Sequence, residues 1–188
     1  MVEEWAAVIL TGGTAARMDG VDKASLEYAG RSLLEHALAA VSAAVEVVVV
    51  GEPVPTSRPV TFVREEPPMG GPAAGLLAGR DATAARPRFL AVLAVDMPRV
   101  NGATFERLLA AAAGRDGAFL ADHDGRRQLV GVVDVAALDA ARPDEVHGLP
   151  LHRLLAPLDL VSVTGLPGEA ADVDTWADLR DLGAGSEG

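Results

Sequence analysis

The feature that most constrains the fold is the apolar run FLAVLAV at positions 89–95, which stops at Asp96. This run offers no polar side chain to water on either face, as is typical of a strand buried on both sides in a parallel sheet. Two more runs, at 6–10 and 45–50, are largely apolar, and the second is rich in β-branched valine. These segments predict a buried sheet that needs helices on both of its faces.

Segments with helical periodicity alternate with these strands. Leu33, Ala37 and Val41 recur at four-residue spacing within 32–43, which places them on one face of an amphipathic helix. Asn101 is a suitable N-cap for another helix. The same criteria predict helices at 73–80, 150–155 and 175–182, and strands at 60–63, 117–121, 129–133 and 159–163.

Length and composition agree with one globular domain. The chain has 188 residues, of which 49% are hydrophobic and 23% are charged. Such a chain is long enough to bury a core and is not rich enough in charge to stay disordered. We therefore predict an α/β fold, namely a single three-layer Rossmann-like domain over residues 1–182 with a mostly parallel central sheet, and a flexible tail at 183–188.

Charge and composition argue against several classes of function. The net charge of −11 is unfavourable for a nucleic-acid binder, which needs clustered Lys and Arg to displace counterions. Cysteine is absent, so disulfides and thiolate metal sites are excluded. The N-terminus carries acids where a signal peptide carries bases, and the longest apolar run is too short to span a membrane. We expect a cytoplasmic protein that binds neither nucleic acid nor membrane.

The loop after the first predicted strand contains the residue types of an anion site. Gly12 and Gly13 are adjacent, and Arg17 and Lys23 follow. Glycine lets backbone N–H groups approach an anion, and the two cations suit phosphate oxygens. Lys23 is the single lysine among sixteen basic residues. The loop is neither a Walker A nor a G-x-G-x-x-G motif, so a tight turn with two surface cations is the alternative.

Carboxylates are candidates for a metal site. Asp96 ends the most apolar strand, and ligands of such sheets bind at the carboxyl ends of strands. A carboxylate there can hold Mg²⁺ together with substrate phosphates, although a turn-capping Asp is the alternative. Asp172 and Asp174 offer a second ligand. The alternative there is a capping box of Thr175 and Asp178 that starts the last helix.

These motifs follow one another in the order found in a known family. The run LTGGTAARMDGVDKASLEYAGRSLLEHAL, residues 10–38, resembles the first motif of the molybdenum cofactor guanylyltransferases, which are MobA-like NTP transferases. That motif reads L-A-G-G, a short spacer, R-M-G, D-K, and then a G-x-x-L-L helix. The resemblance continues through REEPPMGGPAAGL, LAVDMP, GRRQL and DVDTWADL, and so covers nearly the whole chain.

The resemblance implies a fold of the nucleotide-diphospho-sugar transferase type and a nucleotidyltransferase activity. The reaction that it implies is the transfer of GMP from GTP to Mo-molybdopterin, which forms the guanine dinucleotide cofactor and releases pyrophosphate. It implies Mg²⁺ as the metal and contacts with proteins that mature the molybdenum cofactor. It leaves the oligomeric state open.

Residue roles follow from this resemblance and from the chemistry of the loop. The expected catalytic residues are Arg17, Lys23 and Asp96, with Asp96 as the Mg²⁺ ligand and Asp174 as a second candidate ligand. The expected nucleotide-binding residues are Leu10, Thr11, Gly12, Gly13, Lys23, Gly51, Glu66 and Asp96.

The chain departs from the family pattern at several of these positions. Thr11 replaces the usual Ala, and Asp19 stands where Gly normally follows Arg-Met. Gly51 stands where the family often has a guanine-contacting Asn, and Glu66 where it often has Asp. Asp172 and Asp174 stand where guanylyltransferases can carry Asn, and carboxylates are commoner there in cytidylyl and sugar-nucleotide relatives.

Two other functions therefore stay open at this stage. One is a cytidylyltransferase or another nucleotidyltransferase with a different phosphorylated acceptor. The other is a non-catalytic adaptor that holds the nucleotide or the pterin. The polar candidates for the acceptor site are Arg126, Arg127, Gln128, His152 and Arg153.

Overall fold

The computed structural model of the chain describes residues 4–12 and 22–184. The strands in this part are β1 (Trp5–Leu10), β2 (Glu27–Tyr28), β3 (Arg31–Ser32), β4 (Val47–Val50), β5 (Thr61–Val63), β6 (Phe89–Ala94), β7 (Gly117–Ala121), β8 (Arg127–Asp134) and β9 (Leu160–Thr164). The helices are α1 (Leu33–Ala40), α2 (Gly71–Ala82), α3 (Gly102–Ala111), α4 (Val135–Ala140), α5 (Leu151–Leu154) and α6 (Trp176–Ala184), and a 3-10 turn, η2, spans Lys23–Ser25.

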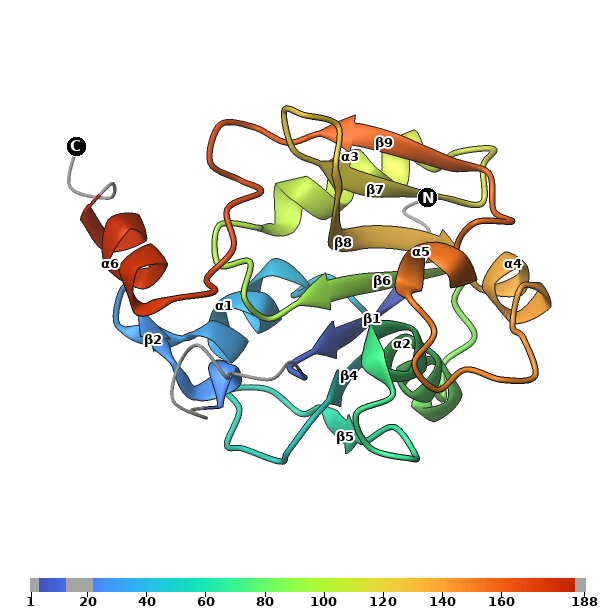
Figure 1. Cartoon of the computed structure of the whole chain (residues 1–188), viewed down its shortest axis with the longest axis horizontal. Helices are drawn as coiled ribbons and strands as arrows, with labels where there is room; N and C mark the ends of the chain where they lie inside the picture. Colours follow the sequence, from blue (N-terminus) through green and yellow to red (C-terminus); the bar gives the residue numbers. More distant parts are fainter. Residues whose placement is uncertain (1–3, 13–21, 185–188) are drawn as a thin grey trace.

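The main sheet has the order β5-β4-β1-β6-β8-β7-β9 (Figure 1). Strands β5, β4, β1 and β6 pair in parallel, and β7 and β9 also pair in parallel. Strand β8 pairs antiparallel with both β6 and β7, so it is the one reversed strand of this sheet in the described residues. The predicted single α/β domain with a mostly parallel sheet is therefore confirmed.

The core consists of two layers, one on each face of the sheet. Trp5, Ala7 and Ile9 of β1 contribute to one layer, together with residues of α1 and α3. Ala6, Val8 and Leu10 contribute to the other, together with residues of α2 and α5. Successive side chains of a strand point to opposite faces, so a strand that is apolar throughout supplies both layers at once.

Small residues let α2 approach the sheet closely. Gly75 and Gly79 lie one helical turn apart and are both buried. A Cβ atom on Gly79 would lie 2.5 Å from Cγ1 of Val8, and one on Gly75 would lie 3.2 Å from Cδ2 of Leu10. Glycine at these two positions therefore sets the distance between α2 and β1, and Gly75 also leaves space at the carboxyl end of β1.

Some elements differ from the sequence predictions. Asn101 caps α3 as predicted, since its side chain accepts a hydrogen bond from Ala103 N. Helix α4 was missed; Asp134 caps it by accepting from Ala136 N and Ala137 N. The hairpin β2–β3 was also missed, because two-residue strands are too short to show a periodicity.

No helix in the described ranges is long and apolar enough to cross a bilayer.

Candidate functional site

A ladder of backbone hydrogen bonds aligns the carboxyl ends of four parallel strands. Gly51 N donates to Val63 O, Thr11 N to Val50 O, and Val95 N to Leu10 O, at 2.9, 3.1 and 3.0 Å. Each donor lies just past the end of its own strand, and each acceptor is the last residue of the neighbouring strand β5, β4 or β1. The ladder places Thr11, Gly51 and Asp96 along one edge, where ligands of parallel sheets bind.

Lys23 is brought to this edge by the turn η2. The side chain of Asp22 caps the turn by accepting from Ala24 N, and Ala24 is buried against the core. The Lys23 side chain is only 11% exposed. Its Nζ donates to Asp96 Oδ2 at 2.8 Å and to Asp174 Oδ1 at 3.0 Å. Three charged groups that are far apart in the sequence therefore meet at one point.

Asp174 is placed by the segment that links β9 to α6, which runs beyond the arrowhead of β6 on its way to α6 in Figure 1. Val173 is fully buried, and its N–H donates to Asp96 O at 2.9 Å. The predicted capping box is present, because Thr175 N donates to Asp178 Oδ2 and Asp178 N donates to Thr175 Oγ1. Capping thus uses Thr175 and Asp178 and leaves the Asp174 carboxylate for Lys23.

The electrostatics of this cluster favour a charged lysine. Burial alone would lower the pKa of Lys23, but the hydrogen bonds and charges of Asp96 and Asp174 outweigh it and raise that pKa above the ordinary value. Burial, and then the negative charge of Asp174, raise the pKa of the neighbouring Asp172. The cluster thus brings three carboxyl groups together, and Lys23 is the cation between those of Asp96 and Asp174.

The donor set fits a divalent metal that is completed by a substrate. Within residues 4–12 and 22–184, no group of three or more His, Cys, Asp or Glu side chains could hold a metal by itself. Asp96 and Asp174 nevertheless share one ammonium partner, so their carboxylates face the same small space. Two carboxylates are a suitable protein contribution for Mg²⁺, which commonly takes its other ligands from water and substrate phosphates.

A second charged group, not predicted from the sequence, anchors the segment that carries Asp174. Glu169 is 5% exposed and accepts hydrogen bonds from Arg107 Nη2, from the Thr104 hydroxyl and from Leu166 N. Burial alone would raise the pKa of Glu169, but these donors outweigh it and lower that pKa. The network ties this segment to α3. Its carboxylate and its cation are 62 residues apart, which is why no local pattern indicated the pair.

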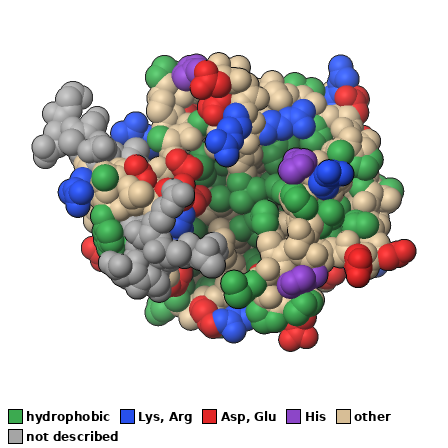
Figure 2. All heavy atoms as spheres, in the orientation of Figure 1, with side chains coloured by type: hydrophobic (Ala, Val, Ile, Leu, Met, Phe, Trp, Pro, Cys, Tyr) green, Lys and Arg blue, Asp and Glu red, His purple; other side chains and the backbone are tan. Residues whose placement is uncertain are grey.

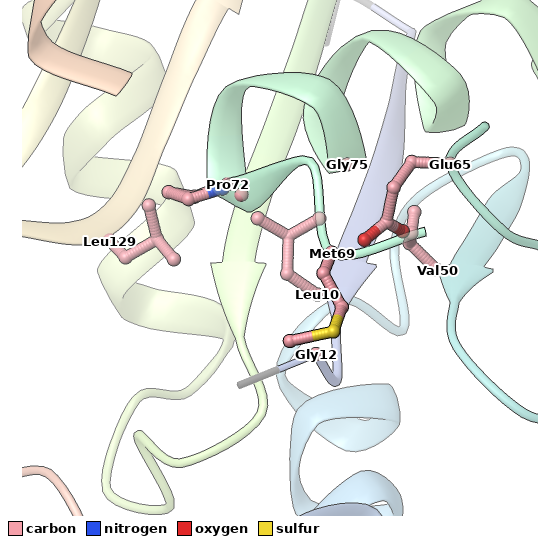
Figure 3. Close-up of a pocket in the computed structure, with 9 residues that line it drawn as sticks. Leu10, Gly12, Val50, Glu65, Met69, Pro72, Gly75 and Leu129 are labelled. Carbon is pink, nitrogen blue, oxygen red and sulfur yellow. The ribbon is translucent and has the colours of Figure 1, made fainter. Parts of the chain in front are cut away.

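A cavity of about 430 Å³ opens at the same sheet edge as the charged cluster, and Figure 3 shows residues that line it. Its walls are mostly apolar or glycine, and its lining residues are Leu10, Gly12, Val50, Glu65, Met69, Gly71, Pro72, Gly75 and Leu129. Leu10 and Gly12 were expected near a nucleotide. Met69 lies at the mouth with 76% of its surface exposed. In Figure 3 the Glu65 carboxyl group is directed toward Leu10 and Met69.

The two adjacent glutamates differ in the cavities that they line. Glu65 lines both the 430 Å³ cavity and a neighbouring cavity of about 540 Å³, whereas Glu66 lines the second, with Arg142, Asp144 and His147, but not the first. The sequence pattern favoured Glu66 as the nucleotide contact, and the geometry adds Glu65 as the nearer candidate. In the acidic pair REEPP, residue types alone could not separate the two.

A third cavity is lined by four of the five polar residues suggested for an acceptor site, and Arg153 is the one that does not line it. The cavity has a volume of about 330 Å³ and is lined by Phe119, Arg126, Arg127, Gln128, Leu129, Leu151, His152 and Leu155. Leu129 lines this cavity and the first one, so the two adjoin. The Arg127 guanidinium donates to Ser162 Oγ and Leu160 O. Figure 2 shows a hollow with hydrophobic side chains at its base and with basic and His side chains on its rim.

The remaining predicted residues have different outcomes. Thr11 and Gly51 lie under the first cavity, at the ends of β1 and β4. Gly13, Arg17 and Asp19 lie outside the described residues, so their predicted roles stay predictions.

Comparisons with known proteins agree with this geometry. Residues 7–161 match the family described as MobA-like NTP transferase domain. The chain is 41% identical to a molybdenum cofactor guanylyltransferase of Acidiphilium cryptum over 71% of this chain and 69% of that protein. It is 34% identical to a probable molybdenum cofactor guanylyltransferase of Mycobacterium tuberculosis, over 82% and 79% of the two chains.

Solved structures share the fold at lower sequence identity. Molybdopterin-guanine dinucleotide biosynthesis protein A of Archaeoglobus fulgidus is 20% identical, with a TM-score of 0.73 over 96% of this chain and 98% of that one. A 2-C-methyl-D-erythritol 4-phosphate cytidylyltransferase of Thermus thermophilus is also 20% identical, with a TM-score of 0.72 over 98% and 100%. The fold is therefore common to enzymes with different bases and acceptors.

The family match over residues 7–161 and the sequence identity to the guanylyltransferases show more than a shared fold. They confirm the predicted nucleotidyltransferase, and they show that the chain belongs to the family of MobA-like NTP transferase domains.

Proposed function

We propose that the chain transfers GMP from GTP to the terminal phosphate of Mo-molybdopterin and releases pyrophosphate. The observation that carries the proposal is the meeting of Lys23, Asp96 and Asp174 beside an apolar cavity at the carboxyl edge of the sheet. The names of the relatives supply the nucleotide and the acceptor, since those relatives are guanylyltransferases of the molybdenum cofactor.

The reaction needs no protein nucleophile. A phosphate oxygen of the acceptor attacks the α-phosphorus of GTP, and the bond from that phosphorus to the bridging oxygen of the β-phosphate breaks. The electron pair leaves with pyrophosphate. Catalysis of such a step depends on alignment of the two substrates and on neutralisation of the charge that develops on oxygen.

The charged cluster supplies this neutralisation. Mg²⁺ held by Asp96 and Asp174 would lower the negative charge on the α-phosphate and the leaving group. Burial works against the charge of Lys23, but both carboxylates outweigh it and raise the pKa, so Lys23 can offer a positive charge to the phosphates. Arg17, in the same loop, would contribute a second cation to the departing pyrophosphate.

The cavity beside the cluster would hold the base, and Glu65 favours guanine there. Guanine presents adjacent N1–H and N2–H donors, which suit a carboxylate acceptor. Cytosine has only its amino group as a donor on the corresponding edge. A negative side chain lining the cavity therefore gives a physical reason to prefer GTP over CTP.

The adjoining cavity would hold the acceptor phosphate. Arg126, Arg127 and His152 line it, in a chain whose net charge is −11. A local group of cations in an acidic protein is a suitable site for an anion. Because Leu129 borders both cavities, an acceptor phosphate there would approach a nucleotide in the first cavity.

A nucleotide screen tests the proposal. We expect GTP with Mg²⁺ to raise the melting temperature more than ATP, CTP or UTP does, and we expect pyrophosphate release to require both GTP and Mo-molybdopterin. Preference for CTP would favour a cytidylyltransferase instead. Tight GTP binding without pyrophosphate release in the presence of the acceptor would favour an adaptor.

A further inference from the structure

Thr11 follows β1 and Gly51 follows the neighbouring strand β4. The side chain of Thr11 fills the space that a side chain at position 51 would need. Thr11 N and Thr11 Oγ1 both donate to Val50 O, at 3.1 and 3.0 Å. A Cβ atom built on Gly51 would overlap Thr11 Oγ1. The φ angle of Gly51 lies outside the left-handed region that favours glycine, so the overlap, and not the backbone, excludes a side chain at position 51.

This pair lies directly beneath the cavity assigned to the nucleotide. Leu10 and Gly12, which flank Thr11, line that cavity, and so does Val50, which accepts both hydrogen bonds. Thr11 itself is 9% exposed and is absent from the lining. Its hydroxyl therefore joins the ends of two strands that form the cavity floor, without forming part of the surface.

We propose that the Thr11 hydroxyl positions the floor of the nucleotide cavity and that it makes glycine obligatory at position 51. This inference rests on the proposed function, because that function assigns the nucleotide to the cavity. The second hydrogen bond to Val50 O holds the end of β4 against the end of β1, which fixes the separation of Val50 and Leu10.

The proposal has a consequence for selectivity. While residue 11 is threonine, no side chain at position 51 can reach the base. The backbone of Gly51 then faces the nucleotide in place of a side chain. The two departures from the family pattern are thus one coupled change. Discrimination between bases then depends more strongly on Glu65, the ionisable residue among the described residues that line the cavity.

A double-mutant cycle tests the coupling. Gly51→Ala should lower the melting temperature by roughly 4–10 °C in the Thr11 protein, because overpacking a rigid site is destabilising. The same substitution in a Thr11→Ala protein should change it by no more than about 2 °C, because the overlap with Oγ1 is gone and the contact left is one of 3.2 Å with the Cβ atom of residue 11. Gly102→Ala is the matched control, since its nearest atom would lie at 3.9 Å. Equal losses in both backgrounds, or failure of both Gly51→Ala proteins to fold, would overturn the coupling.

A second pair of variants tests the positioning role. Thr11→Ser keeps the hydroxyl and should keep the KM for GTP within about twofold. Thr11→Val keeps the shape but loses the hydrogen bond, and should raise that KM about tenfold with little change in kcat. A wild-type KM in Thr11→Val would overturn the positioning role. If the wild-type protein neither bound GTP by calorimetry nor turned it over, the proposed function would fail, while the melting-temperature cycle would still decide the coupling.

Discussion

The charged cluster and the neighbouring cavity lie on the same sheet edge but are built in opposite ways. In the cluster, Lys23 is held by carboxylates 73 and 151 residues away, through hydrogen bonds that need all three groups in place. In the cavity, the shape comes from missing side chains, with glycine at 71 and 75 and apolar strand ends around them. From this difference we expect substitutions in the cluster to lower the rate of transfer. Substitutions in the cavity should instead change the affinity for the nucleotide and the preference among bases.

The largest effect is expected from loss of the ammonium in the cluster. Lys23→Ala should lower kcat/KM about 10²- to 10³-fold, because one preorganised charge contact is removed from the phosphates. Pyrophosphate release under saturating Mo-molybdopterin measures this. Arg115→Ala, which breaks the surface pair with Asp159, is the matched control and should retain activity. A Lys23→Ala enzyme with wild-type turnover would remove the cluster from the mechanism.

The next effect concerns the anchor of the segment that carries Asp174. Glu169→Gln should reduce the free energy of unfolding by about 2 kcal/mol, since a buried carboxylate loses its charge opposite Arg107. Urea unfolding at neutral pH measures this loss. A variant as stable as the wild type would show that the Arg107–Glu169 pair is not an anchor.

The same variant should also change the response to acid. The pKa of Glu169 is lowered in the folded chain, so its contribution is complete above the unfolded pKa and is lost as pH falls through the folded pKa. The wild type should therefore lose more stability than Glu169→Gln between about pH 5 and about pH 3. If the free energy of unfolding fell equally with decreasing pH in the two proteins, the lowered pKa of Glu169 would be contradicted.

A smaller effect is expected at Asp174, whose side chain is 49% exposed compared with 22% for Asp96. Solvent screens a more exposed charge, so Asp174→Asn should lower kcat/KM about tenfold, well below the loss at Lys23. Titration of the activity with Mg²⁺ should show a raised metal requirement. An Asp174→Asn enzyme with an unchanged rate and metal requirement would leave Asp96 as the one protein ligand.

The last effect, similar in size to that at Asp174, is expected in the cavity. Glu65→Gln should lower the preference for GTP over CTP about tenfold, because the amide accepts one hydrogen bond from guanine where the carboxylate accepts two with charge. Glu66→Gln is the matched control, since Glu66, unlike Glu65, does not line the first cavity. If Glu66→Gln changed the preference and Glu65→Gln did not, Glu66 would be the nucleotide contact, as the sequence indicated, and Glu65 would not.

Much of the fold followed from the sequence, because the apolar strands and the helical periodicities are local patterns. Asp96 was found in the same way, as the residue that ends the most apolar strand. The Lys23–Asp174 contact and the Arg107–Glu169 pair could not be predicted, since each joins residues that are adjacent only after β9 has paired with β7 and the segment beyond it has returned to the sheet edge. The overlap of Thr11 with a side chain at position 51 is likewise visible only once β1 and β4 are paired.

The most direct test of the account is the fate of the α-phosphate of GTP. With α-labelled GTP, Mg²⁺ and Mo-molybdopterin, the wild-type protein should place the label on the pterin and release one pyrophosphate for each transfer. Asp96→Asn, folded as judged by circular dichroism, should transfer the label about 10²- to 10³-fold more slowly. A wild-type protein that transfers no label, or an Asp96→Asn protein that transfers it at the wild-type rate, would contradict the account.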